Sequence, residues 1–210
     1  MLEMMRTGGI LMWIIAALSV AAFAVAAERL LFFRRASAAP EPLEEAFRAH
    51  LVLGDMEGAK KLVHGSDSSL HRLFQAAVEH WAAEREDMRL VVEQQIRREL
   101  FRWEKNMSLL EVIGRTTPLL GLLGTVLVMV EMFSSLRTGG QITAAAVTGG
   151  IWKALFTTVA GLSVAIPVLF ASSLLFRRID SEEECLNRGA DFLLRERFLS
   201  PGRKRENPSS

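Results

Sequence analysis

The sequence is poor in the residues that build disulfide-bonded and metal-binding proteins. Cys185 is its single cysteine, and the four histidines, His50, His64, His71 and His80, show no metal-ligand spacing. A lone cysteine excludes an internal disulfide framework and a Cys-x-x-Cys zinc site. The net charge is +1, and no basic run carries interleaved aromatic residues, which argues against a nucleic-acid partner. We therefore expect no metal, no cofactor and no nucleic acid.

The sequence contains three long apolar runs. Residues 8–27 and 154–176 contain no charged residue, and residues 116–136 contain one, Glu131. A helix of about 20 apolar residues crosses the ~30 Å hydrocarbon core of a bilayer. The three runs therefore predict an all-α integral membrane protein with three transmembrane helices and argue against an ordinary soluble enzyme. No nucleophile–base pair, metal set or phosphate loop stands out between the runs, so we expect no enzyme activity.

The basic residues between the runs predict an orientation. Most of the 25 Lys and Arg lie in residues 28–115 and 177–210, including pairs next to the apolar runs such as Arg34–Arg35 and Arg177–Arg178. Basic residues that flank spans mark the cytoplasmic side. We therefore expect the N-terminus outside and the C-terminus inside. The expected segments are an outer N-terminus with the first span (1–33), a cytoplasmic helical loop (34–108), the second span (109–136), an outer hairpin (137–152), the third span (153–178) and a cytoplasmic helix and tail (179–210).

The cytoplasmic loop reads as helical. Short helices are expected from Leu43 to Leu53, after Asp55, and after Asp67 or Ser68, because such residues start helices. No Pro or Gly occurs from Asp87 until Gly114, and apolar residues recur there at helical spacing. These residues form an apolar stripe that consists of Val92, Ile96, Leu100, Trp103, Met107 and Leu110. We expect one long helix there that continues into the second span. The stripe fits equally a contact with a neighbouring subunit or packing against the loop's own helices. Residues 182–197 suggest a further charged helix after the third span, and we expect the helices of the second and third spans to extend into the cytoplasm.

Small and hydroxyl-bearing residues distinguish the second and third runs from the first. Gly121, Gly124 and Gly161 permit close helix approach. Polar residues inside a membrane are costly, so their presence in a span indicates a structural or functional role. Thr125 follows Gly121 by one helical turn, and Thr158 lies on one face with Gly161. Such faces suit tight packing or the lining of a pore, and periodicity alone does not choose between the two.

Two strings in these runs resemble a known family. TPLLGLLGTV (residues 117–126) and GGIWKALFTTVAGLSVAIP (residues 149–167) are similar to the motifs of the MotA/TolQ/ExbB proton channel family, in its ExbB/TolQ branch. The strings include the prolines Pro118 and Pro167, which we group with the three glycines as packing positions. The chain length, three spans and large first loop are similar as well. Flagellar MotA-type proteins usually have a fourth span, which argues against that branch.

The resemblance implies a function. It implies a homo-oligomeric, pentameric subunit of an inner-membrane proton channel whose second and third spans surround the single helix of an ExbD/TolR-like partner. The work output would be transport with a TonB-like protein or envelope maintenance with a TolA-like protein. Family threonines that line the central space fall on Thr125 and Thr158, whose hydroxyls can both donate and accept hydrogen bonds. The surrounding membrane lipid is the remaining expected contact.

One residue departs from the family pattern. Lys153 stands where the family usually has glutamate. Its ammonium could hold down the pKa of a partner aspartate, pair with Glu131, or reach the outer interface along its own aliphatic stem. We therefore count Glu131 and Lys153 with Thr125 and Thr158 as candidate proton-pathway residues. Lys153 also supports an alternative of another class, a non-conducting membrane scaffold that organises partner helices.

Overall fold

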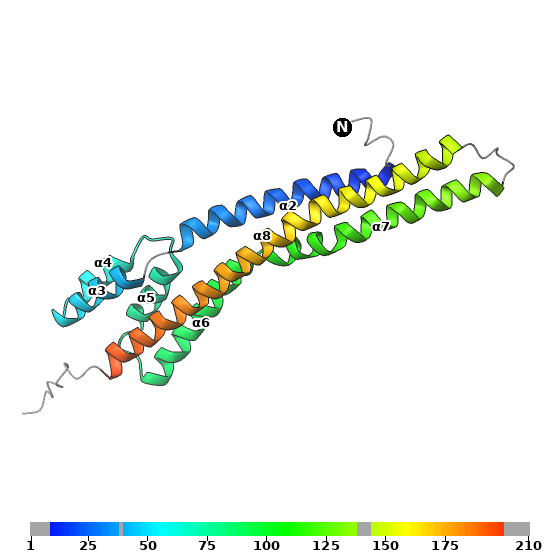
Figure 1. The fold of residues 1–210 in the computed structure, drawn as a ribbon. Helices are drawn as coiled ribbons and strands as arrows, with labels where there is room; N and C mark the ends of the chain where they lie inside the picture. Colours follow the sequence, from blue (N-terminus) through cyan, green and yellow to red (C-terminus); the bar gives the residue numbers. More distant parts are fainter. Residues whose placement is uncertain (1–8, 38–39, 138–143, 200–210) are drawn as a thin grey trace, which may run out of the picture. The chain divides into compact units, whose positions relative to one another are not determined.

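The computed structural model describes residues 9–37, 40–137 and 144–199, and these residues are helical apart from short turns. The helices are α2 (Gly9–Ala36), α3 (Pro40–Val52), α4 (Met56–Val63), α5 (Ser69–Glu79), α6 (Arg85–Glu104), α7 (Met107–Arg137) and α8 (Ala144–Phe198) (Figure 1). No strand occurs in the three described ranges. The predicted all-α fold is confirmed. Parts of the expected outer N-terminus, outer hairpin and C-terminal tail, residues 1–8, 138–143 and 200–210, lie outside the described residues.

The chain divides into two compact units. The first, which we call the membrane unit, comprises residues 1–30 and 106–175, and the second, the bundle unit, comprises residues 31–105 and 176–210. Helix α8 contributes its first part to the membrane unit and its last part to the bundle unit. The helix predicted at residues 182–197 is therefore not a separate element but the end of α8. No helix-ending residue stands between Phe176 and Glu182, which explains why the helix continues.

Among the described residues, three segments are long and apolar enough to cross a membrane, and they belong to α2, α7 and α8. Large side chains such as Phe23, Leu122 and Ile166 are exposed on them. In water such surface would be unfavourable, whereas in hydrocarbon it is the expected outer face of a span. The protein is an integral membrane protein with three candidate spans, as the three apolar runs predicted.

Helix α7 continues through a proline. Pro118 lies inside α7 and has no N–H to donate to the turn before it. Just before it, Thr116 Oγ1 donates to the Val112 carbonyl at 2.7 Å, and Thr117 Oγ1 donates to the Ile113 carbonyl. The carbonyl that Pro118 leaves without a backbone donor is that of Gly114, whereas these two hydroxyls donate to carbonyls one and two residues earlier. The threonines therefore satisfy their own donors inside the helix, as polar groups within a membrane must.

The expected single helix from Asp87 into the second span is broken. Helix α6 ends at Glu104, and α7 begins at Met107. Asn106 between them has a positive φ of 63°, a conformation that asparagine adopts more readily than most residues. Its side-chain amide donates to Glu28 of α2 at 3.1 Å, which holds it there. The prediction of one uninterrupted helix was wrong because it considered only Pro and Gly as helix-breaking residues.

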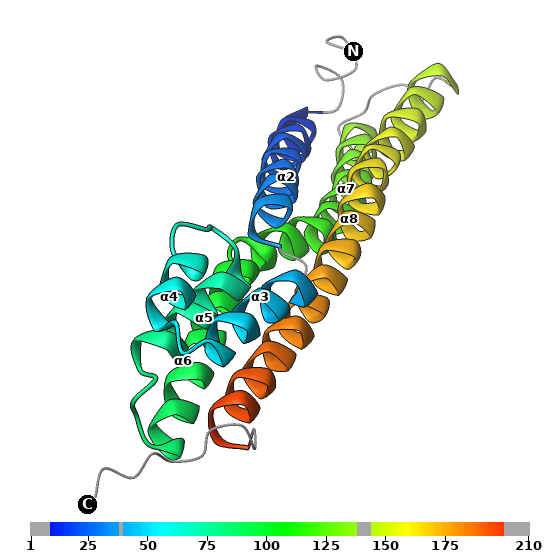
Figure 2. The same ribbon diagram turned by 90° about the vertical axis from the view of Figure 1, so that its left-hand side faces the viewer.

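The bundle unit has a conventional apolar core. Helices α3 to α6 lie beside the end of α8 in Figure 2, and buried side chains from these helices and α8 form one cluster. Asp55 caps α4 by accepting a hydrogen bond from the Gly58 N–H at 2.8 Å, as predicted. Helix α3 begins at Pro40, three residues before the expected start, because proline suits the first turn of a helix.

The apolar stripe of the loop is divided between the units. Val92 and Ile96 are buried in the core cluster of the bundle unit, and Leu100 packs against it. Trp103 belongs to the same unit and is buried next to Phe33, with ring centroids 4.4 Å apart. Met107 and Leu110 are buried in the membrane unit. Packing within the chain, rather than a contact with a neighbouring subunit, therefore occupies this stripe.

Candidate functional site

The membrane unit contains a close contact between α7 and α8, which lie side by side in both ribbon views (Figures 1 and 2). Gly121 and Gly161 lie at its centre. A Cβ atom on Gly161 would be 2.8 Å from the Thr117 carbonyl oxygen and 3.1 Å from the Gly121 Cα. A Cβ on Gly121 would be 3.0 Å from the Thr157 carbonyl oxygen. The two backbones therefore touch where neither residue has a side chain, the arrangement that small residues permit between membrane helices.

The contact extends along both helices through small residues. A Cβ on Gly124 would lie 2.8 Å from the Thr157 hydroxyl oxygen. Ala154 and Ala165 are buried on the α8 side, at helical spacing on either side of Gly161. Gly114 belongs to the same face, because a Cβ there would meet Leu169 at 2.8 Å. Close approach of this kind maximises dispersion contacts, which drive helix association where no water is displaced.

Two threonines that the motif comparison did not single out are buried in this contact. Thr117 and Thr157 have no exposed surface. Each hydroxyl is satisfied within its own helix, Thr117 by the Ile113 carbonyl and Thr157 by the Ala154 carbonyl at 2.7 Å. Their roles are therefore in packing. Neighbouring threonines in the pairs 116–117 and 157–158 point about 100° apart around a helix, so the string alone does not reveal which one is buried.

The two predicted threonines lie at the edge of the contact and are partly exposed. Thr158 Oγ1 donates to the Gly121 carbonyl oxygen at 3.4 Å, a hydrogen bond from α8 to α7. Thr125 Oγ1 donates to the Leu122 carbonyl at 2.7 Å within α7. Since each hydroxyl donates its proton to a backbone carbonyl, its oxygen keeps lone pairs that can accept a hydrogen bond. Both threonines thus present acceptors next to a face of small residues.

Glu131 and Lys153 are brought together. Their carboxylate Oε2 and ammonium Nζ are 3.9 Å apart, one on α7 and one on α8. The Lys153 side chain is 33% exposed and that of Glu131 is 76% exposed. The pair is therefore a long ion pair at the surface of the unit, not a buried one. Of the arrangements considered for Lys153, pairing with Glu131 is the one that the structure contains.

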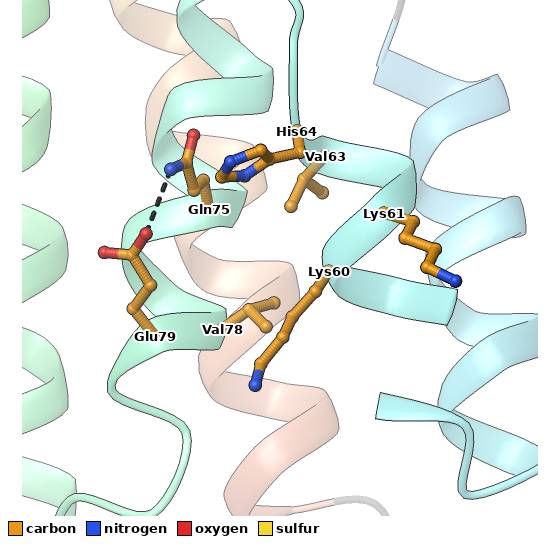
Figure 3. A pocket seen from close by; sticks show the side chains of 7 residues that line it. All are labelled: Lys60, Lys61, Val63, His64, Gln75, Val78 and Glu79. Carbon is orange, nitrogen blue, oxygen red and sulfur yellow. Dashed lines mark hydrogen bonds between the residues drawn. The ribbon is translucent and has the colours of Figure 1, made fainter. Parts of the chain in front are cut away.

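A cavity in the bundle unit is the other candidate, and its side chains do not converge. It measures about 230 Å³ and lies between α4 and α5. Figure 3 shows Lys60 and Lys61 pointing in different directions, while Gln75 donates to Glu79 at 2.9 Å. Lys60 is also paired with Glu57 at 3.3 Å. A ligand site needs polar groups aimed at a common point, so this cavity supports no function. No cluster of three metal-ligating side chains occurs among the described residues.

Three candidate spans and the close contact between α7 and α8 define a helical integral membrane protein. The family model described as the MotA/TolQ/ExbB proton channel family matches residues 65–188. This chain belongs to that family. The match includes all of α7 and most of α8, and so it contains the candidate site.

Individual relatives agree with the family. The chain is 31% identical over 179 residues to a Synechocystis protein named ExbB-like 1, a match that covers 83% of this chain and 70% of the relative. It is 29% identical over 182 residues to a Methanothermobacter thermautotrophicus protein described as an ExbB homologue, with 86% and 64% covered. A shorter match, 42% identical over 76 residues, is to the biopolymer transport protein ExbB of Neisseria gonorrhoeae, with 36% of this chain and 34% of the relative covered. The chain thus spans less than two thirds of the length of two of these three curated relatives.

Proposed function

We propose that the chain is the channel-forming subunit of an ExbB/TolQ-type complex that couples a proton gradient to work. The observation that carries this proposal is the α7–α8 contact of Gly121 and Gly161, with the acceptor oxygens of Thr125 and Thr158 at its edge. Both sequence strings that resemble the ExbB/TolQ branch map to this contact. The match of the family model over the same residues supports the proposal further.

The complex that we propose is homo-oligomeric, with five copies around a single-span ExbD/TolR-like partner. Exposed apolar faces on α7 and α8 support subunit contacts, because they remain unpartnered within one copy. In this arrangement the hydroxyls of Thr125 and Thr158 hold water near a carboxyl of the partner, since they can accept hydrogen bonds without adding charge. Force then passes to a TonB-like or TolA-like protein, for transport or for envelope maintenance.

The orientation belongs to the same proposal. We place the protein in a bacterial inner membrane with its N-terminus in the periplasm and its C-terminus in the cytoplasm. Arg34, Arg35, Arg177 and Arg178 support this, because they lie near the bundle-unit ends of α2 and of the apolar part of α8. Basic residues next to spans remain on the cytoplasmic side. A cysteine-labelling experiment on intact cells, with one cysteine placed in the outer hairpin and one in α3, tests the orientation directly.

Proton flux in liposomes tests the channel. The chain is reconstituted with and without an ExbD/TolR-like subunit, and a pH-sensitive dye reports flux after a potential is applied. We expect flux to require the partner and to fall at least tenfold in Thr158→Ala. Thr148→Ala is the matched control, because this exposed threonine of α8 bonds only to the Ala144 carbonyl of its own helix, at 2.8 Å. Flux that survives both Thr158→Ala and removal of the partner's membrane carboxyl contradicts the proposal.

The alternative of a non-conducting scaffold is favoured by one observation, the Glu131–Lys153 ion pair. A cation where the family usually has a glutamate changes the charge near the channel. A scaffold predicts that the partner co-purifies with the chain while flux stays at the level of empty liposomes. If Lys153→Glu then produced flux in that complex, Lys153 would be the residue that separates the two functions.

A further inference from the structure

Glu182 is a buried acid in the core of the bundle unit. It lies on α8 and is 5% exposed. Its neighbours one turn along α8 include the buried Cys185 and Leu186, which belong to the apolar core cluster. A carboxylate in such surroundings is costly, because burial removes the water that stabilises its charge. The side chain therefore needs either full hydrogen bonding or a proton.

The hydrogen bonding of Glu182 is incomplete. Its Oε2 accepts a hydrogen bond from the Ser37 hydroxyl at 3.4 Å, a long one. Its Oε1 is buried and has no hydrogen-bond partner among the residues that the structure describes. A protonated carboxyl loses far less on burial than an ionised one, so this geometry favours the neutral acid.

A second buried acid of the bundle unit, by contrast, has hydrogen-bond partners for both carboxylate oxygens. Glu99 of α6 is 2% exposed, yet it accepts hydrogen bonds from Arg102 at 2.7 Å and from Gln95 at 3.0 Å. Its charge is therefore compensated locally, which buried ions require. Among the described residues, no guanidinium forms an ion pair with Glu182, and the like charge of Glu99 acts on it instead.

Some groups around Glu182 raise the pKa of its carboxyl, and others lower it. Burial is the main influence and raises the pKa of Glu182 to about 7, to which the like charge of Glu99 adds. The Ser37 hydrogen bond and the Arg178 guanidinium, one turn earlier on α8, oppose it by favouring the carboxylate. On the other side of Glu182, burial raises the pKa of the Cys185 thiol to about 11, so this thiol stays neutral. Arg188 of α8 and Glu41 and Glu44 of α3 also act on Cys185, with Arg188 lowering the pKa of its thiol and the two glutamates raising it.

We propose that Glu182 is a proton-binding site of the bundle unit, protonated in acid and ionised in alkali, whose ionisation destabilises the packing of α8 against the segment that contains Ser37. The ligand is the proton itself. In the proposed orientation this proton comes from the cytoplasm, and that clause alone rests on the proposed function. The site is separate from Thr125 and Thr158, which belong to the membrane unit.

The direction of the pH effect follows from linkage. In the unfolded chain Glu182 titrates near 4.5, whereas in the folded chain it titrates near 7. Between these values the folded state binds more protons than the unfolded state. Stability is therefore highest below the unfolded pKa and declines as pH rises through the folded one. This is the reverse of the usual carboxylate, which stabilises a protein as it ionises.

The test uses the purified full chain in detergent, without a partner. Infrared difference spectra across a pH titration report the protonated carboxyl band, and thermal unfolding followed by circular dichroism reports stability. We expect a carboxyl band that disappears near pH 7 in the natural protein and is absent in Glu182→Gln. The unfolding temperature of Glu182→Gln should no longer fall over that range. Glu183→Gln, the exposed neighbour on the same helix, is the matched control and should behave as the natural protein.

A second variant tests the assignment without removing the acid. Ser37→Ala deletes the hydrogen bond that favours the charged form, so the midpoint of the carboxyl band should move to higher pH. This outcome is informative even if Glu182→Gln does not fold. The other acids of the chain also contribute carboxyl bands at low pH, so the component that disappears near pH 7 is the one that decides. Its absence from the natural protein, or its persistence in Glu182→Gln, overturns the proposal. Because no flux is measured, failure here and failure of the channel proposal are distinct results.

Discussion

Large side chains stabilise the bundle unit, whereas small side chains stabilise the membrane unit. In the bundle unit, large residues such as Phe47, Phe74 and Met88 fill a core that is closed to solvent. In the membrane unit, the contact between α7 and α8 depends on residues with little or no side chain, while the large apolar residues are exposed. Burial of apolar area stabilises the first unit in water. In lipid that force is missing between helices, so close backbone approach takes its place.

The comparison predicts that the bundle unit is most sensitive to loss of volume. Phe74 is fully buried, with its ring centroid 5.0 Å from that of Phe47 and 5.9 Å from that of Phe192. Phe74→Ala removes the transfer energy of the ring and leaves a cavity, so we expect a loss of about 3–5 kcal/mol in unfolding free energy. Denaturant unfolding in detergent measures this. Phe101→Ala, at a position 75% exposed on α6, is the control and should change stability little; equal losses in the two variants would contradict a closed core.

The membrane unit should respond to the opposite change. Gly161→Ala adds a single methyl group that meets the Thr117 carbonyl, a backbone atom that cannot rotate away. We expect a loss of about 1–3 kcal/mol, the usual range for overpacking, with a shift of the oligomer distribution on size-exclusion chromatography.

Gly149→Ala is the matched control for that prediction. It lies on the same helix, and a Cβ there has open space within 4 Å. Alanine favours helix more than glycine does, so this variant should be neutral or slightly stabilising. If Gly161→Ala behaved in the same way, the close approach of α7 and α8 would not be a determinant of stability.

A single hydrogen bond in the bundle unit gives a smaller effect. Trp103 Nε1 donates to the Ser69 hydroxyl at 2.8 Å, and both residues are buried. Ser69→Ala leaves the indole N–H without this acceptor, which should cost about 1–2 kcal/mol. The fluorescence of Trp103 should shift as well, and Trp103→Phe in the Ser69→Ala background should recover part of the loss. No recovery would mean that Ser69 acts through its volume and not through this hydrogen bond.

The sequence predicted features that follow from composition or from a residue type with a strong local preference. The three apolar runs predicted the spans, and Asp55 predicted the cap of α4. Features that depend on one backbone angle were missed. Asn106 ends the expected long helix through a positive φ that its side-chain bond to Glu28 supports, and the partner is 78 residues away in sequence.

The candidate site was predictable in position but not in detail. The glycines identified the contact face because only small residues allow backbones to touch. Which threonine of the pair 157–158 is buried depends on the rotation of α8, and periodicity leaves this angle undetermined over a run of small residues. Glu182 was missed for a related reason. In sequence, a glutamate in a charged segment resembles any exposed acid, and only the fold shows that Glu182 is buried and feels the charge of Glu99.

The smallest predicted effect concerns the ion pair that separates this chain from its family pattern. Lys153 and Glu131 are 3.9 Å apart and partly or largely exposed, so a double-mutant cycle with Lys153→Met and Glu131→Gln should give a coupling below about 1 kcal/mol. The coupling should weaken further as salt is added, because exposed charges are screened. A coupling of several kcal/mol that resists salt would place the pair in a medium of low dielectric constant, as a subunit interface or the membrane would provide. In that case Lys153 and Glu131 of the membrane unit would depend on each other for charge compensation, as the buried Glu99 of the bundle unit depends on Arg102.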